Sequence, residues 1–119
     1  MNWKIDKNRA ICPQICEQLC AHIAAGDFLP GQRIMSVRDA AVAAGVNPNT
    51  VQRAFEQLEQ QGVLRSERGS GWYVADNTDT ALQVREKIMR QKADAFFREM
   101  RSLGMSDKQI KEFVKEWNS

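Results

Sequence analysis

The sequence predicts a mainly α-helical protein with one small β-hairpin, in which a domain over residues 1–76 precedes a helical segment over residues 81–119. Two observations lead to this prediction. Apolar residues recur at spacings of three and four in several stretches, as they do along one face of a helix. Near the middle of the chain, two β-prone segments surround a short turn that contains glycine.

Length and composition are those of a small globular protein. The 119 residues can build one compact core and a small appendage. A hydrophobic fraction of 43% and a charged fraction of 27% are ordinary, and no apolar run approaches the roughly 20 residues of a membrane span. No signal-peptide pattern is present, so we expect a cytoplasmic protein with reduced cysteines and no membrane partner. The net charge of +2 neither requires nor excludes nucleic acid.

The first two helices are expected on either side of a Leu29-Pro30-Gly31 turn. In residues 11–25, isoleucine and leucine recur at every fourth position, and Gly26 ends the helix. Ser36 then begins a second, alanine-rich helix as its N-cap. Gly45 ends that helix, because glycine readily adopts the left-handed backbone conformation.

A third helix begins at Asn47-Pro48, where asparagine caps free amides and proline gives up no needed donor. Its apolar residues follow the spacing of a buried stripe, and Gly62 ends it. The stripe consists of Val51, Ala54, Phe55 and Leu58. Two helices joined by a tight glycine turn, the second of them amphipathic, form a helix-turn-helix.

The β-prone segments over residues 63–66 and 71–74 come directly after this third helix. The four residues between them, 67–70, are charged or small and contain Gly69, so the whole reads as a hairpin. A helix-turn-helix followed by a hairpin is a winged helix-turn-helix.

The C-terminal segment follows a polar stretch, residues 76–80, that we interpret as a linker. Gly104 ends the first of its two predicted helices, and Ser106 with Gln109 begins the second as a capping box. The apolar residues that face a partner are predicted to be Met89, Ala93, Phe96, Met100, Leu103, Ile110, Phe113, Val114 and Trp117. A helical hairpin of about forty residues cannot bury two such stripes alone, so we expect a homodimer.

The third helix carries the predicted chemistry on the face opposite its buried stripe. A helical wheel directs Asn49, Arg53 and Glu56 outward and puts Gln52 at the edge. Asparagine, glutamine and arginine read adenine or guanine edges in a major groove, and Thr50 in the first turn can contact phosphate. The alternative interpretation, a merely solvated polar face, is less favoured because a tight turn precedes the helix and a hairpin follows it.

Two further cations are expected to support this face. Arg38 lies in the first turn of the second helix, where free amides and a guanidinium together favour phosphate. Its alternative is a surface ion pair with Asp39 or Glu56. Arg68 with Gly69 at the hairpin tip can enter a minor groove or follow phosphates, although an ordinary turn would also explain the glycine.

Three segments together resemble the DNA-binding domain of GntR-type bacterial regulators. They are residues 36–38, 45–55 and 68–74, and the resemblance extends from about Ile11 to Val74. Many members have Ser-Arg or Thr-Arg where this chain has Asn47-Pro48, so base reading is expected to shift towards Asn49, Gln52 and Arg53. The full set of predicted DNA-binding residues is Arg38, Asn47, Asn49, Thr50, Gln52, Arg53, Arg68 and Gly69.

The Asn-Pro-Asn-Thr-Val sequence with a short helical C-terminus is similar to the YtrA subfamily of these regulators. The resemblance implies a homodimer held by the C-terminal helices and an inverted-repeat operator of double-stranded DNA. It also implies repression, often of a transporter operon. A small-molecule effector, if there is one, is expected between the two parts or at the dimer seam.

Other functions find less support in the sequence. Cys12, Cys16 and Cys20 form one row on the first helix, which could ligate a soft metal or sense oxidants, but small buried hydrophobic residues are the favoured interpretation. We predict no metal and no cofactor. We also predict no enzyme, since there is no Gly-rich phosphate loop and no paired nucleophile and base. A winged-helix adaptor that binds protein instead of DNA remains the alternative.

Overall fold

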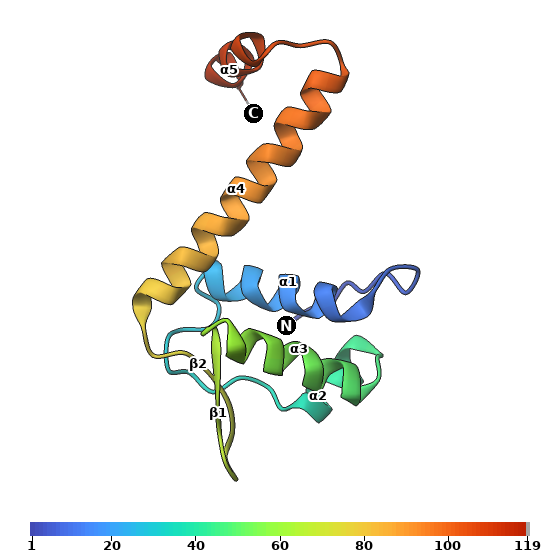
Figure 1. Cartoon of the computed structure of the whole chain (residues 1–119), viewed down its shortest axis with the longest axis vertical. Coiled ribbons are helices and arrows are strands. Elements are labelled where there is room, and N and C mark those ends of the chain that lie inside the picture. The colour runs from blue at the N-terminus through green and yellow to red at the C-terminus, as the bar shows by residue number, and fades with distance from the viewer. Residues whose placement is uncertain (119) are drawn as a thin grey trace. The chain divides into compact units, whose positions relative to one another are not determined.

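The computed structural model describes residues 1–118, so that Ser119, the end of the predicted C-terminal segment, lies outside the described residues. Figure 1 shows the order of the elements. They are α1 (Ile11–Ala24), α2 (Val37–Ala44), α3 (Pro48–Gln60), β1 (Leu64–Glu67), β2 (Gly71–Val74), α4 (Thr78–Ser102) and α5 (Asp107–Glu116). The predicted fold class, mainly helical with a two-stranded wing, is confirmed. Two compact units divide the chain, Met1–Arg85 and Glu86–Ser119.

Helix α3 lies at the centre of the first unit, because α1, α2 and β1 all pack against it. Figure 1 shows α1 running along α3, with α2 beside the start of α3. The predicted stripe of α3 is fully buried. The core consists of Ile15, Leu19, Ile23, Ile34, Ala40, Ala41, Val51, Ala54, Phe55, Leu58, Val63, Leu64 and Val74.

The helix-turn-helix forms through the local signals that the sequence contains. The Ser36 hydroxyl accepts a hydrogen bond from the Asp39 amide at 3.0 Å and caps α2. Gly45 ends α2 with a φ of 69°, a conformation that residues with a side chain rarely adopt. Asn47 then caps α3 by accepting from the Asn49 amide at 2.8 Å, with Pro48 in the first position of the helix. These predictions are confirmed.

The wing is held from both sides. β1 and β2 are antiparallel, with Leu64 opposite Val74 and Glu67 opposite Gly71. The segment before α2 extends the sheet, since the Ile34 amide donates to the Trp72 carbonyl at 2.9 Å. On the side of α3, the Trp72 ring meets Phe55 edge to face, with the centroids 5.5 Å apart. The wing is therefore fixed relative to α3 by its base.

The N-terminal segment folds back onto α1. Gln14 is buried, and its carbonyl oxygen accepts from the Asp6 amide at 2.8 Å while its Nε2 donates to the Asp6 and Ala10 carbonyls. One turn further along, Gln18 exchanges hydrogen bonds with both backbone groups of Lys4. Residues 3–9 are thereby held against α1.

Helix α4 begins earlier than the sequence predicts. We interpreted residues 76–80 as a linker, but α4 starts at Thr78, so that interpretation is wrong for the second half of the stretch. The reason is local: the Asn77 side chain accepts from the Asp79 amide at 2.9 Å and satisfies the first turn. Ala81 and Val84 then pack against the core of the first unit.

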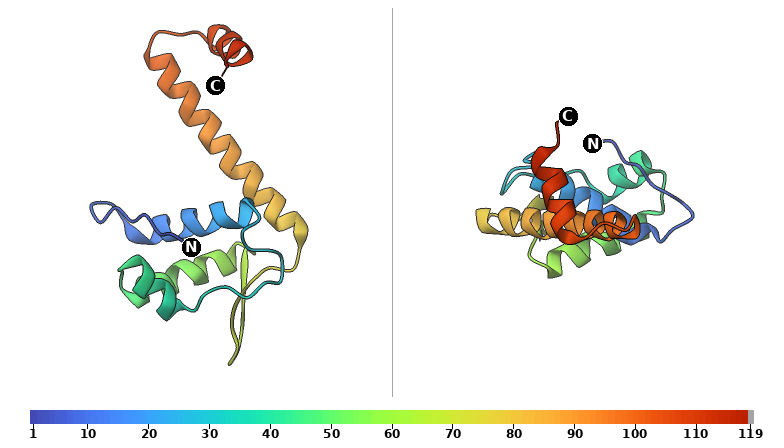
Figure 2. Two further views of the ribbon diagram at one scale, coloured as in Figure 1. Left: turned by 180° about the vertical axis from the view of Figure 1, so that it is seen from behind. Right: turned by 90° about the horizontal axis from the view of Figure 1, so that it is seen from above.

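The second unit contains the rest of α4 and α5, joined by a tight turn. The predicted capping box is present: the Gln109 amide donates to the Ser106 hydroxyl at 3.2 Å, and the Ser106 amide donates to Gln109 Oε1 at 2.8 Å. Figure 2 shows α5 set at an angle to α4. Within residues 1–118, no helix combines the length and apolar character that crossing a membrane requires.

Candidate nucleic-acid interface

The exposed face of α3 carries the polar side chains that the helical wheel predicts. Asn49, Arg53 and Glu56 are exposed, and Gln52 is half-buried at the edge. The buried stripe on the opposite side fixes this direction, because rotating α3 would expose Phe55 and Leu58. The face is therefore a consequence of the core.

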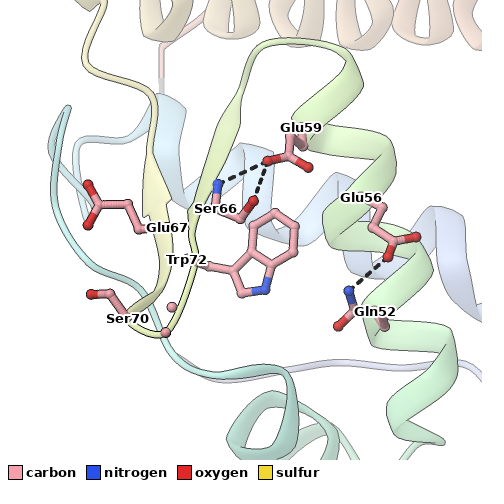
Figure 3. Close-up of a pocket in the computed structure, with 9 residues that line it drawn as sticks. Gln52, Glu56, Glu59, Ser66, Glu67, Ser70 and Trp72 are labelled. Carbon is pink, nitrogen blue, oxygen red and sulfur yellow. Dashed lines mark hydrogen bonds between the residues drawn. The ribbon is translucent and has the colours of Figure 1, made fainter.

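A cleft of about 470 Å³ lies between the polar face of α3 and the wing. Figure 3 shows Gln52 and Glu56 on the helix and Trp72 and Ser66 on the strands facing it. Its lining residues are Gln52, Glu56, Glu59, Ser66, Glu67, Gly69, Ser70, Gly71 and Trp72. The structure thus brings together two predicted DNA-binding residues, Gln52 and Gly69, that are distant in the sequence.

Three glutamates are among the lining residues, and each has a different partner, although Glu67 directs its carboxylate away from α3 (Figure 3). Glu59 accepts from the Ser66 amide at 3.0 Å and from the Ser66 hydroxyl at 2.6 Å, and so ties the wing to α3. Glu67 pairs with Arg65 at 2.5 Å within the wing. Glu56 accepts from Gln52 Nε2 at 2.8 Å, one turn back on the same helix (Figure 3). The first two carboxylates stabilise the wing, whereas the third acts on a predicted base-reading side chain.

The predicted cations lie on the elements expected of them. Arg38 is exposed on the first turn of α2, Arg53 on α3 and Arg68 at the wing tip. None of the ion pairs found within residues 1–118 involves these three arginines. The alternative pairing of Arg38 with a carboxylate is therefore not observed, and these guanidinium groups remain available to an anion.

Two other predicted contacts are constrained by the start of α3. Asn47 uses its side-chain oxygen to cap the helix, which leaves its amide nitrogen as the group that can reach a phosphate. Thr50 is half-buried in the first turn, and its backbone amide is bonded to the Asn47 carbonyl. For all eight residues, contact with DNA stays a prediction.

Two cations that the sequence did not indicate also lie beside the site. The ammonium of Lys7 is 3.9 Å from the point where a Cβ on Gly45 would stand, so it lies at the turn between α2 and α3. The guanidinium of Arg33 lies against Gly71 of the wing, with its Nε 3.3 Å from the corresponding point. Both lysine and arginine stand in stretches without periodicity, so no sequence signal could have placed them.

Two of the three cysteines, Cys12 and Cys16, contact α3. The thiols of Cys12 and Cys16 donate to Gln57 Oε1 at 3.6 and 3.7 Å. Burial, together with the neighbouring Cys12 and Cys20, raises the pKa of the Cys16 thiol to about 12. A thiol with such a pKa is neutral near pH 7 and a poor nucleophile. Within the described part of the chain, no cluster of three His, Cys, Asp or Glu residues is arranged to hold a metal.

Comparison with known proteins agrees with this geometry. The family described as bacterial regulatory proteins, gntR family, matches residues 13–74, close to the extent of the resemblance noted above. The transcriptional repressor YtrA of Bacillus subtilis is 30% identical over 112 residues, which are 89% of this chain and 82% of YtrA.

Two solved structures are also similar. A GntR family transcriptional regulator from Listeria monocytogenes superposes with a TM-score of 0.86 at 31% identity, covering 96% of this chain and all of that one. The DNA-binding domain of AraR in complex with its operator ORX1 gives a TM-score of 0.54 at 29% identity, over 60% of this chain and 87% of that domain.

Proposed function

Because the chain belongs to the GntR family of bacterial regulatory proteins, and is a DNA-binding transcription regulator, we propose that it binds an inverted-repeat operator as a homodimer and represses transcription. Operator binding is supported by the AraR domain, whose solved structure contains its operator. Repression is supported by the similarity to YtrA, which is named a repressor. Such a regulator acts in the cytoplasm, by binding and not by catalysis.

The observation that carries the proposal is the pairing of α3 with the wing. Helix α3 presents Asn49 and Arg53 to solvent, and the cleft beside it reaches Gly69 at the wing tip. A recognition helix in a major groove places an adjoining wing over the neighbouring backbone or minor groove. The proposed base readers and backbone contacts thus lie on adjacent elements that share one core.

The homodimer is proposed from the apolar surface of the second unit. Leu103 is 75% exposed and Trp117 63% exposed, and large apolar groups at such exposure favour association. Five more residues of the predicted seam are exposed in the single chain: Met89, Ala93, Phe96, Phe113 and Val114. Met100 is half-buried, and the prediction is wrong for Ile110, which is fully buried within its own chain and cannot face a partner. Burying this surface in a symmetric pair would present two α3 helices to the two halves of a palindrome.

Selection of bound duplexes from a random pool, followed by a salt titration of the selected sequence, tests the proposal. We expect an inverted-repeat consensus and an affinity that falls steeply with salt, since phosphate contacts release counterions. A consensus without symmetry would contradict the dimer. Failure to enrich any duplex at low salt, with retained binding of a protein partner, would favour the adaptor alternative.

Single variants assign roles within the interface. Arg38→Ala is expected to weaken binding to all duplexes, because a phosphate contact carries no sequence information. Arg53→Ala is expected to weaken binding and to alter preference at one base by roughly 1–3 kcal/mol. Arg98→Ala, which removes the same charge from an exposed site in the second unit, is the matched control. Equal losses for Arg53→Ala on specific and random duplexes would refute its base-reading role.

The regulated genes and the effector stay predictions. The resemblance of the Asn-Pro-Asn-Thr-Val sequence to the YtrA subfamily implies a transporter operon. An effector site at the dimer seam would be tested by adding candidate ligands to the protein–operator complex and measuring release of the duplex.

A further inference from the structure

The hydrogen bond between Gln52 and Glu56 restricts what Gln52 can read. Gln52 Nε2 donates to Glu56 Oε1 at 2.8 Å across one turn of α3. An ionised carboxylate has no hydrogen to donate, so only the NH₂ end of the Gln52 amide can face it. The partner therefore determines which end of the amide is which, a choice that an isolated glutamine leaves open.

The remaining groups of the Gln52 amide form a defined pattern. Of its two N–H donors, one is held by Glu56, which leaves one donor and the Oε1 acceptor. Adenine presents an N7 acceptor beside an N6 amino donor in the major groove, which matches that pair. Guanine presents two acceptors, N7 and O6, and would require the second N–H that Glu56 already holds.

The charge of the cleft favours the same orientation. Glu59 lies on the wall that Gln52 shares and keeps its negative charge there, because its partners, the Ser66 amide and hydroxyl, are neutral. Such a wall repels phosphate and attracts the amino groups on base edges. Gln52 is thus directed to a base amino group and away from the backbone.

We propose that Glu56 is a positioning residue that orients the Gln52 amide to read adenine and to reject guanine at one position of each half-site. The inference rests on the proposed function, because it requires operator binding. Glu56 itself need not contact DNA: it acts through Gln52.

The experiment measures the affinity of the full chain for four duplexes that differ at the position Gln52 reads. That position is the one whose base preference disappears in Gln52→Ala. We expect the unsubstituted protein to prefer adenine to guanine there by roughly tenfold or more, as a good bidentate pair does. Glu56→Gln and Glu56→Ala should each reduce this preference to about threefold or less, while preferences at other positions persist.

Two controls distinguish an effect of Glu56 on the orientation of the Gln52 amide from an effect of its negative charge alone. Glu17→Gln removes one negative charge from an exposed site on α1 and should leave the adenine preference unchanged. In Gln52→Ala, adding Glu56→Gln should change nothing further at that position, because the two residues act as one unit. Thermal unfolding of each variant checks that Glu56, an exposed side chain, can be replaced without loss of the fold.

Several outcomes would overturn the inference. If Glu56→Gln tightens binding to all four duplexes by one common factor, Glu56 acts only through charge repulsion. If Gln52→Ala keeps every base preference, or if the affected position prefers guanine, Gln52 is not an adenine reader. After any of these three outcomes, operator binding, and thus the proposed function, would stand. Failure of the unsubstituted protein to bind any duplex would instead refute both.

Discussion

The two units of this chain differ in how completely they bury their apolar residues. In Met1–Arg85, three helices and the wing enclose a continuous core, and Phe55 at its centre is inaccessible to solvent. In the second unit, the fully buried hydrophobic side chain among the described residues is Ile110, while Phe96, Leu103 and Trp117 face solvent. The first unit buries its core within a single chain, whereas the second exposes the apolar surface that the proposed homodimer would bury.

The largest expected effect tests the core of the first unit. Phe55→Ala should lower the free energy of unfolding by about 3–5 kcal/mol, because it leaves a cavity and removes the contact with Trp72. Phe96→Ala removes the same group from the second unit. It should lower the free energy of unfolding by less than about 1 kcal/mol at protein concentrations too low for dimers. Urea denaturation followed by circular dichroism measures both. Similar losses of unfolding free energy in the two variants would show that the units do not differ in how they bury their aromatic residues.

The next effect concerns association through the second unit. Leu103→Asp places a charge on the exposed stripe and should raise the dimer dissociation constant at least about tenfold, since burying an unpaired charge is costly. Leu29→Asp is the matched control, because Leu29 is 60% exposed in the first unit. Sedimentation equilibrium measures both constants. An effect of Leu29→Asp as large as that of Leu103→Asp would locate the interface elsewhere.

A smaller effect tests the proposal that the first unit contacts DNA and that the second unit does not. Lys7→Ala should reduce the slope of log affinity against log salt by about one per protomer, because one phosphate contact is lost. This expectation rests on the position of the Lys7 ammonium at the turn before α3. Lys111→Ala on α5 should leave the slope unchanged. An unaltered slope for Lys7→Ala would show that its ammonium does not reach the backbone.

The smallest effect lies within the second unit, at the turn between α4 and α5. Arg101 donates to both oxygens of Asp107, at 2.7 and 3.0 Å, which lowers the pKa of Asp107. A lowered pKa in the folded state stabilises the fold above the unfolded value of about 4, and this contribution is lost as the pH falls through the folded value.

Asp107→Asn should therefore reduce the melting temperature slightly at pH 7 and leave it unchanged at a pH below both values. Scanning calorimetry at the two pH values checks this. Asp94→Asn removes a charge near Arg101 without removing a hydrogen bond, and should show the smaller difference. A deficit in Asp107→Asn that is the same at both pH values would contradict the role of the ion pair.

Local signals made much of the fold predictable. Ser36, Gly45 and the Asn47-Pro48 pair begin or end their helices as expected, and the apolar stripe of α3 is buried. Each signal acts within about one turn of helix, so neighbouring residues suffice to read it. The error at residues 76–80 has the same origin, since Asn77 can end a turn or cap a helix and α4 uses it as a cap.

The sequence by itself therefore determined the elements, their caps, and the direction in which α3 turns its polar face. Only the tertiary structure decided which distant groups meet there: Lys7 beside Gly45, Arg33 along Gly71, and Glu59 bonded to Ser66. Periodicity reports which side of an element is buried, because burial depends on a repeating pattern of apolar side chains. It contains no information on the neighbour across a gap, which depends on how whole elements pack.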